Sequence, residues 1–177
     1  KAWFAEQQDF AAEKGLTPLL SDVYQTAFGI SERLKADNCP FLTQQWQYQV
    51  ETAGEIEGMK FRGFMDAFNL FTVCDIKTCT DAGAGFKKQM RQNHVNVQLA
   101  LYMEASGAGE GHVLALEVKP PYDWQIWTLY YGSEEYKKAI SIARGWLEDF
   151  GRWSDMGKPS IGPQFWGPTR EIELYNY

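Results

Sequence analysis

The 177-residue chain has no apolar run near the roughly 20 residues that a membrane-spanning helix requires. Its first 14 residues contain acidic and Gln side chains where a secretion signal would need an apolar stretch. The sequence also lacks internal repeats and low-complexity tracts. These absences favour a globular protein over a membrane-spanning, secreted or fibrous protein.

Cysteine is scarce as well. Cys39, Cys74 and Cys79 cannot all pair with one another, and their spacing lacks the C-x-x-C unit of a zinc or iron–sulfur site. We therefore expect reduced, buried thiols, which agrees with a cytoplasmic location.

Aromatic residues, in contrast, make up 15% of the chain, and 45% of all residues are hydrophobic. This supply of bulky apolar side chains is enough to close one core without disulfides or a structural metal. We interpret residues 1–177 as a single domain. Because the chain starts at Lys1 without Met, we treat it as a domain from which an upstream segment can be missing.

The formal net charge of -6 argues against a protein that coats nucleic acid with its whole surface. The charge is unevenly distributed, however, because residues 60–91 carry six cations and three anions. A basic stretch with isolated carboxylates suits a site for a polyanion and divalent cations. A chance fluctuation over a window of this length explains the charge balance equally well.

Hydrophobic periodicity and breaker residues predict helices, three strands, a helix, two strands and a final helix. The predicted helices are 2–14, 21–36, 86–105 and 133–153, and the predicted strands are 44–51, 59–67, 71–78, 112–118, 124–131 and 171–175. The three consecutive strands predict an antiparallel meander. The whole order indicates an α/β fold with a mixed central β-sheet flanked by helices.

One strand carries an unusual pair of charges. Asp75 and Lys77 are two residues apart, so their side chains leave the same face of a strand that is otherwise apolar. Asp66 is the only charged residue in the apolar stretch 63–68, on the preceding strand. If these strands form a hairpin, Asp66 and Asp75 approach closely enough to bind one cation.

Hard carboxylate oxygens favour Mg²⁺ or Mn²⁺ over zinc. Lys77 could then polarise a phosphate oxygen or orient a water, as in metal-assisted phosphodiester hydrolysis. The spacing alone is equally compatible with a buried Asp75–Lys77 ion pair and with Asp66 in a turn.

Longer motifs carry a family resemblance. The runs GMKFRGFMDAFN and FTVCDIKTCTDAGAGF, followed by Gln98 and Tyr102 on the next predicted helix, resemble the PD-(D/E)XK nuclease superfamily. More narrowly, the chain is similar to the exonuclease VIII (RecE)-type nucleases of phage and prophage recombination. The resemblance covers residues 44–131, includes the LEVKPPY segment at 116–122, and implies a restriction-endonuclease-like core.

The resemblance assigns a role to each matching residue. It implies that Asp66 and Asp75 are metal ligands, together with the backbone carbonyl of Ile76, and that Lys77 is the catalytic lysine. Gln98 and Tyr102, four residues apart on one helical face, would contact phosphate or water. Their alternative role is a polar rim on a core-facing helix.

Lys87, Lys88 and Arg91 lie early in the same predicted helix. They are candidates to hold the DNA backbone, and the alternative is that they are solvated surface charges.

The resemblance implies a Mg²⁺-dependent deoxyribonuclease, acting as a 5′ to 3′ exonuclease on linear double-stranded DNA in phage-type recombination. It also implies a ring-shaped homo-oligomer and a single-strand annealing protein as partner, in a bacterial or phage-infected cell. Two alternatives stay open: a catalytically inactive DNA-binding or assembly subunit on the same scaffold, and a ligand-binding domain rich in aromatic residues.

The chain departs from the family pattern at two places. Gln47 stands where members often have an acidic residue, and Glu51 is the nearest carboxylate on the same strand face. Members also often have a His or Glu on a helix further upstream, and no His precedes Asp66 here. These departures motivate the inactive-subunit alternative.

Three further residues are set aside. We interpret His94 as a packing or rim residue and not as a ligand. Glu117 and Lys119 form a second E-x-K pattern, but no partner carboxylate precedes them at hairpin distance, so we expect no site there.

Overall fold

The computed structural model of the protein describes Lys14 and residues 21–157. The helix expected over 2–14 and the short strand expected over 171–175 lie outside the described residues. Among the residues that are described, no helix combines the length and apolarity needed to cross a membrane.

Within residues 21–157 the strands form one five-stranded sheet in which sheet order follows chain order. The strands are β1 (Gln47–Ile56), β2 (Met59–Asn69), β3 (Thr72–Cys79), β4 (Glu110–Glu117) and β5 (Trp124–Tyr130). β1, β2 and β3 form the predicted antiparallel meander, β3 and β4 are parallel, and β4 and β5 are antiparallel. The predicted mixed sheet is confirmed.

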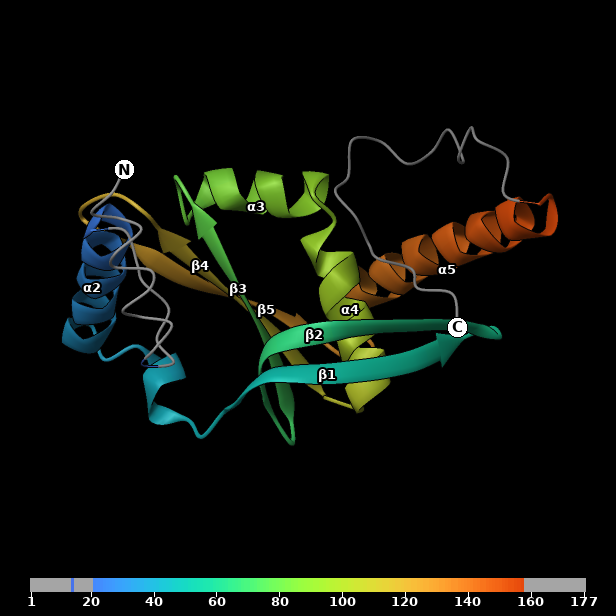
Figure 1. The fold of residues 1–177 in the computed structure, drawn as a ribbon, viewed down its shortest axis with the longest axis horizontal. Coiled ribbons are helices and arrows are strands. Elements are labelled where there is room, and N and C mark those ends of the chain that lie inside the picture. The colour runs from blue at the N-terminus through green and yellow to red at the C-terminus, as the bar shows by residue number, and fades with distance from the viewer. Residues whose placement is uncertain (1–13, 15–20, 158–177) are drawn as a thin grey trace.

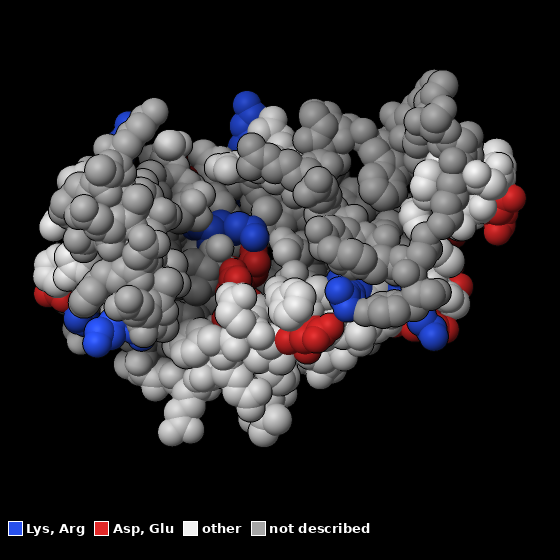
Figure 2. Space-filling model, viewed as in Figure 1, with Lys and Arg blue, Asp and Glu red and all other residues white. Residues whose placement is uncertain are grey.

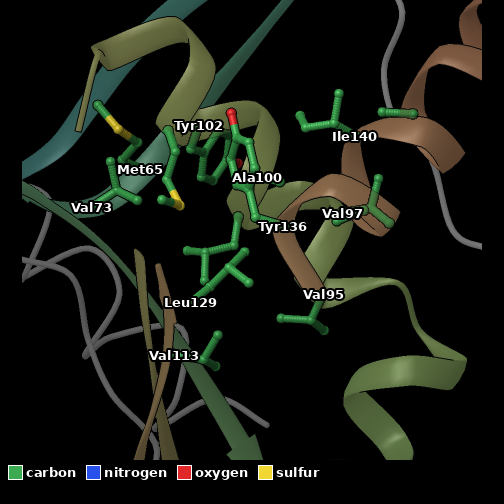
Figure 3. Packing of buried hydrophobic residues seen from close by; sticks show 14 of the residues in the cluster. Met65, Val73, Val95, Val97, Ala100, Tyr102, Val113, Leu129, Tyr136 and Ile140 are labelled. Carbon is green, nitrogen blue, oxygen red and sulfur yellow. The ribbon is translucent and has the colours of Figure 1, made fainter. Parts of the chain in front are cut away.

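Helices cover both faces of this sheet (Figure 1). They are α2 (Ser21–Ala36), the 3₁₀ helix η1 (Pro40–Thr43), α3 (Ala84–Gln92), α4 (Val95–Ser106) and α5 (Glu134–Asp155). α2 and η1 pack on one face through Leu34 and Phe41. α4 and α5 pack on the other face, where Val113 and Leu129 of the sheet meet their buried side chains (Figure 3).

The central strand β3 is buried on both faces. Val73 and Cys79 belong to the core under α4, whereas Cys74 belongs to the smaller core under α2. This alternation follows from the two-residue period of a strand. The three cysteines are free and buried, as expected.

The single helix predicted over 86–105 is wrong, because the chain changes direction between α3 and α4. His94 adopts a left-handed backbone with φ +52°, which ends the run of helical residues. Its ring packs edge-on against Trp146, with ring centroids 4.8 Å apart, so its expected packing role is confirmed. The physical reason for the break is burial: α4 is buried over much of its surface, whereas Phe86 is the buried residue of α3.

The strand predicted over 44–51 is also wrong in extent, because 52–56 do not form the turn between the first two strands. β1 continues to Ile56, and the hairpin turns at Glu57 and Gly58, both of which have positive φ. The sequence looks like a turn because of Gly54, yet this glycine makes room for Phe61 on the paired strand. A Cβ at Gly54 would lie 2.6 Å from the Phe61 ring.

Gly111 of β4 lies so close to α4 that a side-chain methyl group at this position should destabilise the fold. A Cβ there would lie 2.7 Å from Leu99 Cγ and 2.8 Å from Met103 Sδ. We expect Gly111→Ala to lower the free energy of unfolding by about 1–3 kcal/mol, because a packed core resists expansion. Gly109→Ala is the control, since a Cβ at that position meets nothing within 4 Å. Equal urea midpoints for the two variants would contradict this account.

Candidate functional site

The site forms where β2 leaves β3. The two strands pair from Asn69 opposite Thr72 to Ala67 opposite Cys74, and the pairing stops there. Beyond this point β2 continues with β1 as a long hairpin that diverges from β3 (Figure 1).

Asp66 is the first residue past the end of this pairing. Its Oδ2 accepts a hydrogen bond from the backbone N–H of Ile76 at 2.7 Å. The carboxylate thus takes the place of the backbone carbonyl that a paired strand would offer to this N–H. In an extended strand the C=O and N–H of one residue point to the same neighbouring strand, so the Ile76 carbonyl also faces the Asp66 side.

Asp75 and Lys77 share the face of β3 that lies under α4. Their neighbours on β4 are Val113 and Ala115, which belong to the core on that face. Lys77 Nζ lies 3.1 Å from Asp75 Oδ1 and 2.9 Å from Oδ2. The hydrogen bond goes to Oδ1, and Oδ2 is buried without a hydrogen-bond donor in spite of the nearby ammonium charge.

Asp75 is only 2% exposed, and this burial raises its pKa to about 6 from an ordinary 3.8. The Lys77 ammonium acts in the opposite direction, and the nearby Asp66 carboxylate adds to the rise. The two carboxylates are therefore close enough to repel each other. Figure 2 shows acidic and basic side chains next to one another near the middle of one face.

α4 brings a second pair of predicted residues to this region. Gln98 Nε2 donates a hydrogen bond to the hydroxyl of Tyr102 at 2.9 Å. Burial raises the pKa of the Tyr102 phenol, and the charge of Asp75 contributes to that rise, so the ring lies within electrostatic reach of β3. Gly63 of β2 makes room for the ring, because a Cβ there would lie 2.7 Å from Tyr102 Cε1.

The β1 side chain that contacts Asp66 is not one that the sequence singled out. Gln47 stands opposite Phe68, and Glu51 lies 3.6 Å from Arg62. Gln49, between them, places Nε2 3.4 Å from Asp66 Oδ1. Strand alternation puts all three on one side, so only the pairing register with β2 could have distinguished Gln49.

The basic residues predicted to hold DNA lie on α3, at the end of β3. Lys87, Lys88 and Arg91 are exposed, and Lys87 Nζ is 5.9 Å from the centre of the Trp127 ring. These three residues follow β3 in the sequence and are not part of the Asp66–Asp75 carboxylate pair.

The loop between β3 and α3 is held by two acidic side chains. Asp81 accepts hydrogen bonds from the N–H groups of Gly83 and Gly85, each at 2.8 Å. Glu117 accepts one from Ala82 at 2.9 Å, which gives this carboxylate a structural partner.

The donor set suits a hard divalent cation. In the described part of the chain no three His, Cys, Asp or Glu residues gather as a metal-binding group. Asp66, Asp75 and the Ile76 carbonyl offer only oxygen atoms as metal ligands. The buried Oδ2 of Asp75 accepts no hydrogen bond from the described residues. Oxygen ligands of this kind fit Mg²⁺ or Mn²⁺.

The family assignment follows from comparison with known proteins. The profile of a PDDEXK-like domain of unknown function (DUF3799) matches residues 1–140. The chain belongs to this family. It is therefore a member of the PD-(D/E)XK superfamily, and the α/β core predicted from the resemblance is confirmed.

A solved structure shares this fold. A Eubacterium rectale protein described as a "putative exonuclease" is 16% identical, with a TM-score of 0.65 over 98% of this chain and 71% of the other. The structure of an alkaline exonuclease from Laribacter hongkongensis is 11% identical, with a TM-score of 0.40 over 86% of this chain and 87% of the other. A search of curated proteins finds no match.

Because the Asp75 carboxylate is buried, we expect the stability of the metal-free protein to depend on pH. Because its pKa rises from 3.8 in the unfolded chain to about 6 in the fold, the fold binds more protons between these values. The associated stabilisation is present below pH 3.8 and is lost as pH rises through about 6.

We expect Asp75→Asn to be more stable than the wild type at pH 7 in EDTA, by on the order of 2–3 kcal/mol. The difference should shrink towards pH 4, as measured by urea unfolding at each pH. Parallel pH profiles for the two proteins would contradict this charge assignment.

Proposed function

We propose that the protein is a Mg²⁺- or Mn²⁺-dependent deoxyribonuclease. The observation that carries the proposal is the meeting of Asp66 and Asp75, from neighbouring strands, beside the ammonium group of Lys77. Membership of a PDDEXK-like family supports it. The resemblance described above also implies that these residues follow the order of that superfamily's motif.

Each residue has a task in this proposal. Asp66, Asp75 and the Ile76 carbonyl hold the cation, which when bound supplies positive charge for a phosphate oxygen and lowers the pKa of a water molecule. Lys77 Nζ donates a hydrogen bond to the scissile phosphate or to the attacking water. Tyr102 and Gln98 contact the phosphate from α4, and burial keeps the Tyr102 hydroxyl protonated.

The reaction is hydrolysis of a phosphodiester. The water oxygen forms a bond to phosphorus, and the bond between phosphorus and the leaving deoxyribose oxygen breaks. The water gives up one proton, and the leaving oxygen takes one from solvent. Lys77 stabilises the negative charge that develops on the phosphate oxygens between these events.

The finer assignments rest on the resemblance to RecE-type nucleases. We propose 5′ to 3′ exonuclease action on linear double-stranded DNA in phage-type recombination, by a homo-oligomeric ring in the cytoplasm working with a single-strand annealing protein. The likeness in fold to a protein described as an exonuclease supports the exonuclease part.

The catalytic role of Lys77 can be tested against a matched lysine. We expect Lys77→Ala to slow digestion of linear duplex DNA in Mg²⁺ by about 100-fold or more, because it removes charge from the reacting phosphate. Lys119→Ala, in the other E-x-K pattern, should leave the rate unchanged, since Lys119 is exposed. A closed circular duplex should resist digestion.

Two outcomes would count against this proposal. Equal rates for Lys77→Ala and the wild type would remove Lys77 from the mechanism. A wild type that cleaves no DNA in Mg²⁺ or Mn²⁺ would favour the inactive DNA-binding or assembly subunit.

A second test addresses the DNA contacts of α3. Replacing Lys87, Lys88 and Arg91 together by Ala should weaken binding of duplex DNA in EDTA and lower the slope of log affinity against log salt by about 2–3, since each phosphate contact contributes about one. Lys137→Ala with Lys138→Ala on α5 is the control, and we expect it to leave the slope unchanged. Identical slopes for the α3 triple variant and the α5 double variant would show that the α3 cations do not contact DNA phosphates.

A further inference from the structure

Gln49 has an unexpected backbone conformation. Its φ is +53°, in the left-handed region that residues other than glycine rarely adopt. Among the described residues, the other non-glycine residues with positive φ lie in turns or at element ends, whereas Gln49 lies within β1. Such strain persists only where the surroundings impose it, and it often marks a functional position.

The strain is located opposite Asp66. β1 and β2 pair at Tyr48 with Ala67 and again at Val50 with Met65, so the intervening partner of Gln49 is Asp66. The pairing between β2 and β3 stops at the same place. Both neighbours of β2 therefore lose regular geometry at Asp66.

The conformation of Gln49 directs its amide towards this carboxylate. Gln49 Nε2 lies 3.4 Å from Asp66 Oδ1, while Asp66 Oδ2 accepts from the Ile76 N–H at 2.7 Å. Asp66 is thus contacted from both sides, by β1 through a side chain and by β3 through the main chain. The Gln49 contact is longer and weaker than the Ile76 bond, and it engages the other oxygen of the carboxylate.

We propose that Gln49 is a positioning residue, whose amide holds the Asp66 carboxylate in the orientation that faces Ile76 and Asp75. An amide suits this task because it donates to Asp66 without adding a third negative charge to the carboxylate pair. The effect of Gln49 on cation binding rests on the proposed function. Its effect on the orientation of the Asp66 carboxylate does not.

The test reads the Asp66–Ile76 hydrogen bond directly, by NMR hydrogen exchange of the Ile76 amide in EDTA. Gln49→Leu and Gln49→Gly both remove the donor, and we expect each to reduce protection of this amide by about 5- to 10-fold. Gly tolerates positive φ, so Gln49→Gly should unfold at a higher temperature than Gln49→Leu. Gln47→Leu, two residues earlier on β1, is the control and should leave the Ile76 amide unchanged.

The same variants are then titrated with Mn²⁺ by calorimetry. We expect Gln49→Leu and Gln49→Gly to bind about 10-fold more weakly than the wild type, as for residues that orient a metal ligand. Gln47→Leu should bind as the wild type does.

Two results would overturn the role of Gln49. One is wild-type protection of the Ile76 amide in both Gln49 variants. The other is a loss of protection spread evenly over all β3 amides, which indicates a merely structural role. A wild type that binds no Mn²⁺ would instead refute the proposed metal site, and the exchange data would still decide whether Gln49 positions Asp66.

Discussion

The hydrogen bond from the Ile76 N–H to the Asp66 carboxylate is the contact on which the site depends. It forms where β2 stops pairing with β3, and it gives the unpaired edge of β3 an acceptor. Without a side chain at this position, the chain would leave a partly buried N–H unsatisfied, which is costly. The Asp66 carboxylate accepts the hydrogen bond of the Ile76 N–H and is thereby brought beside Asp75. One contact therefore ends the sheet pairing and assembles the charged site.

The second constraint is the burial of Asp75 in the middle of the sheet. A carboxylate at this depth is held by one lysine and carries an oxygen that lacks a hydrogen-bond donor. A structure selected for stability alone would place an apolar residue there, since replacing buried charges often stabilises a fold. The cost is concentrated at Asp75, and Gln49 adds backbone strain a short distance away. Local costs that accumulate at one place in an otherwise well-packed fold indicate function and not packing.

The sequence predicted the parts of the structure that depend on local periodicity. The two-residue spacing of Asp75 and Lys77 places both on one strand face, and the four-residue spacing of Gln98 and Tyr102 gives the observed hydrogen bond along α4. The break at His94 was missed, because it follows from how deeply α4 is buried, which only tertiary packing decides. The length of the β1–β2 hairpin was missed because Gly54 signals a turn unless Phe61 on the paired strand is known.

Gln49 illustrates the same limit within the site itself. On β1 the alternation of residues puts Gln47, Gln49 and Glu51 on one side, and nothing local ranks them. The family pattern draws attention to Gln47 and Glu51, whereas the register with β2 places Gln49 opposite Asp66. Register is a property of paired strands, fixed by where the hairpin turns at Glu57. A shift of that turn by one residue would bring a different side chain to Asp66, so the geometry of the site depends on a turn at the far end of the hairpin.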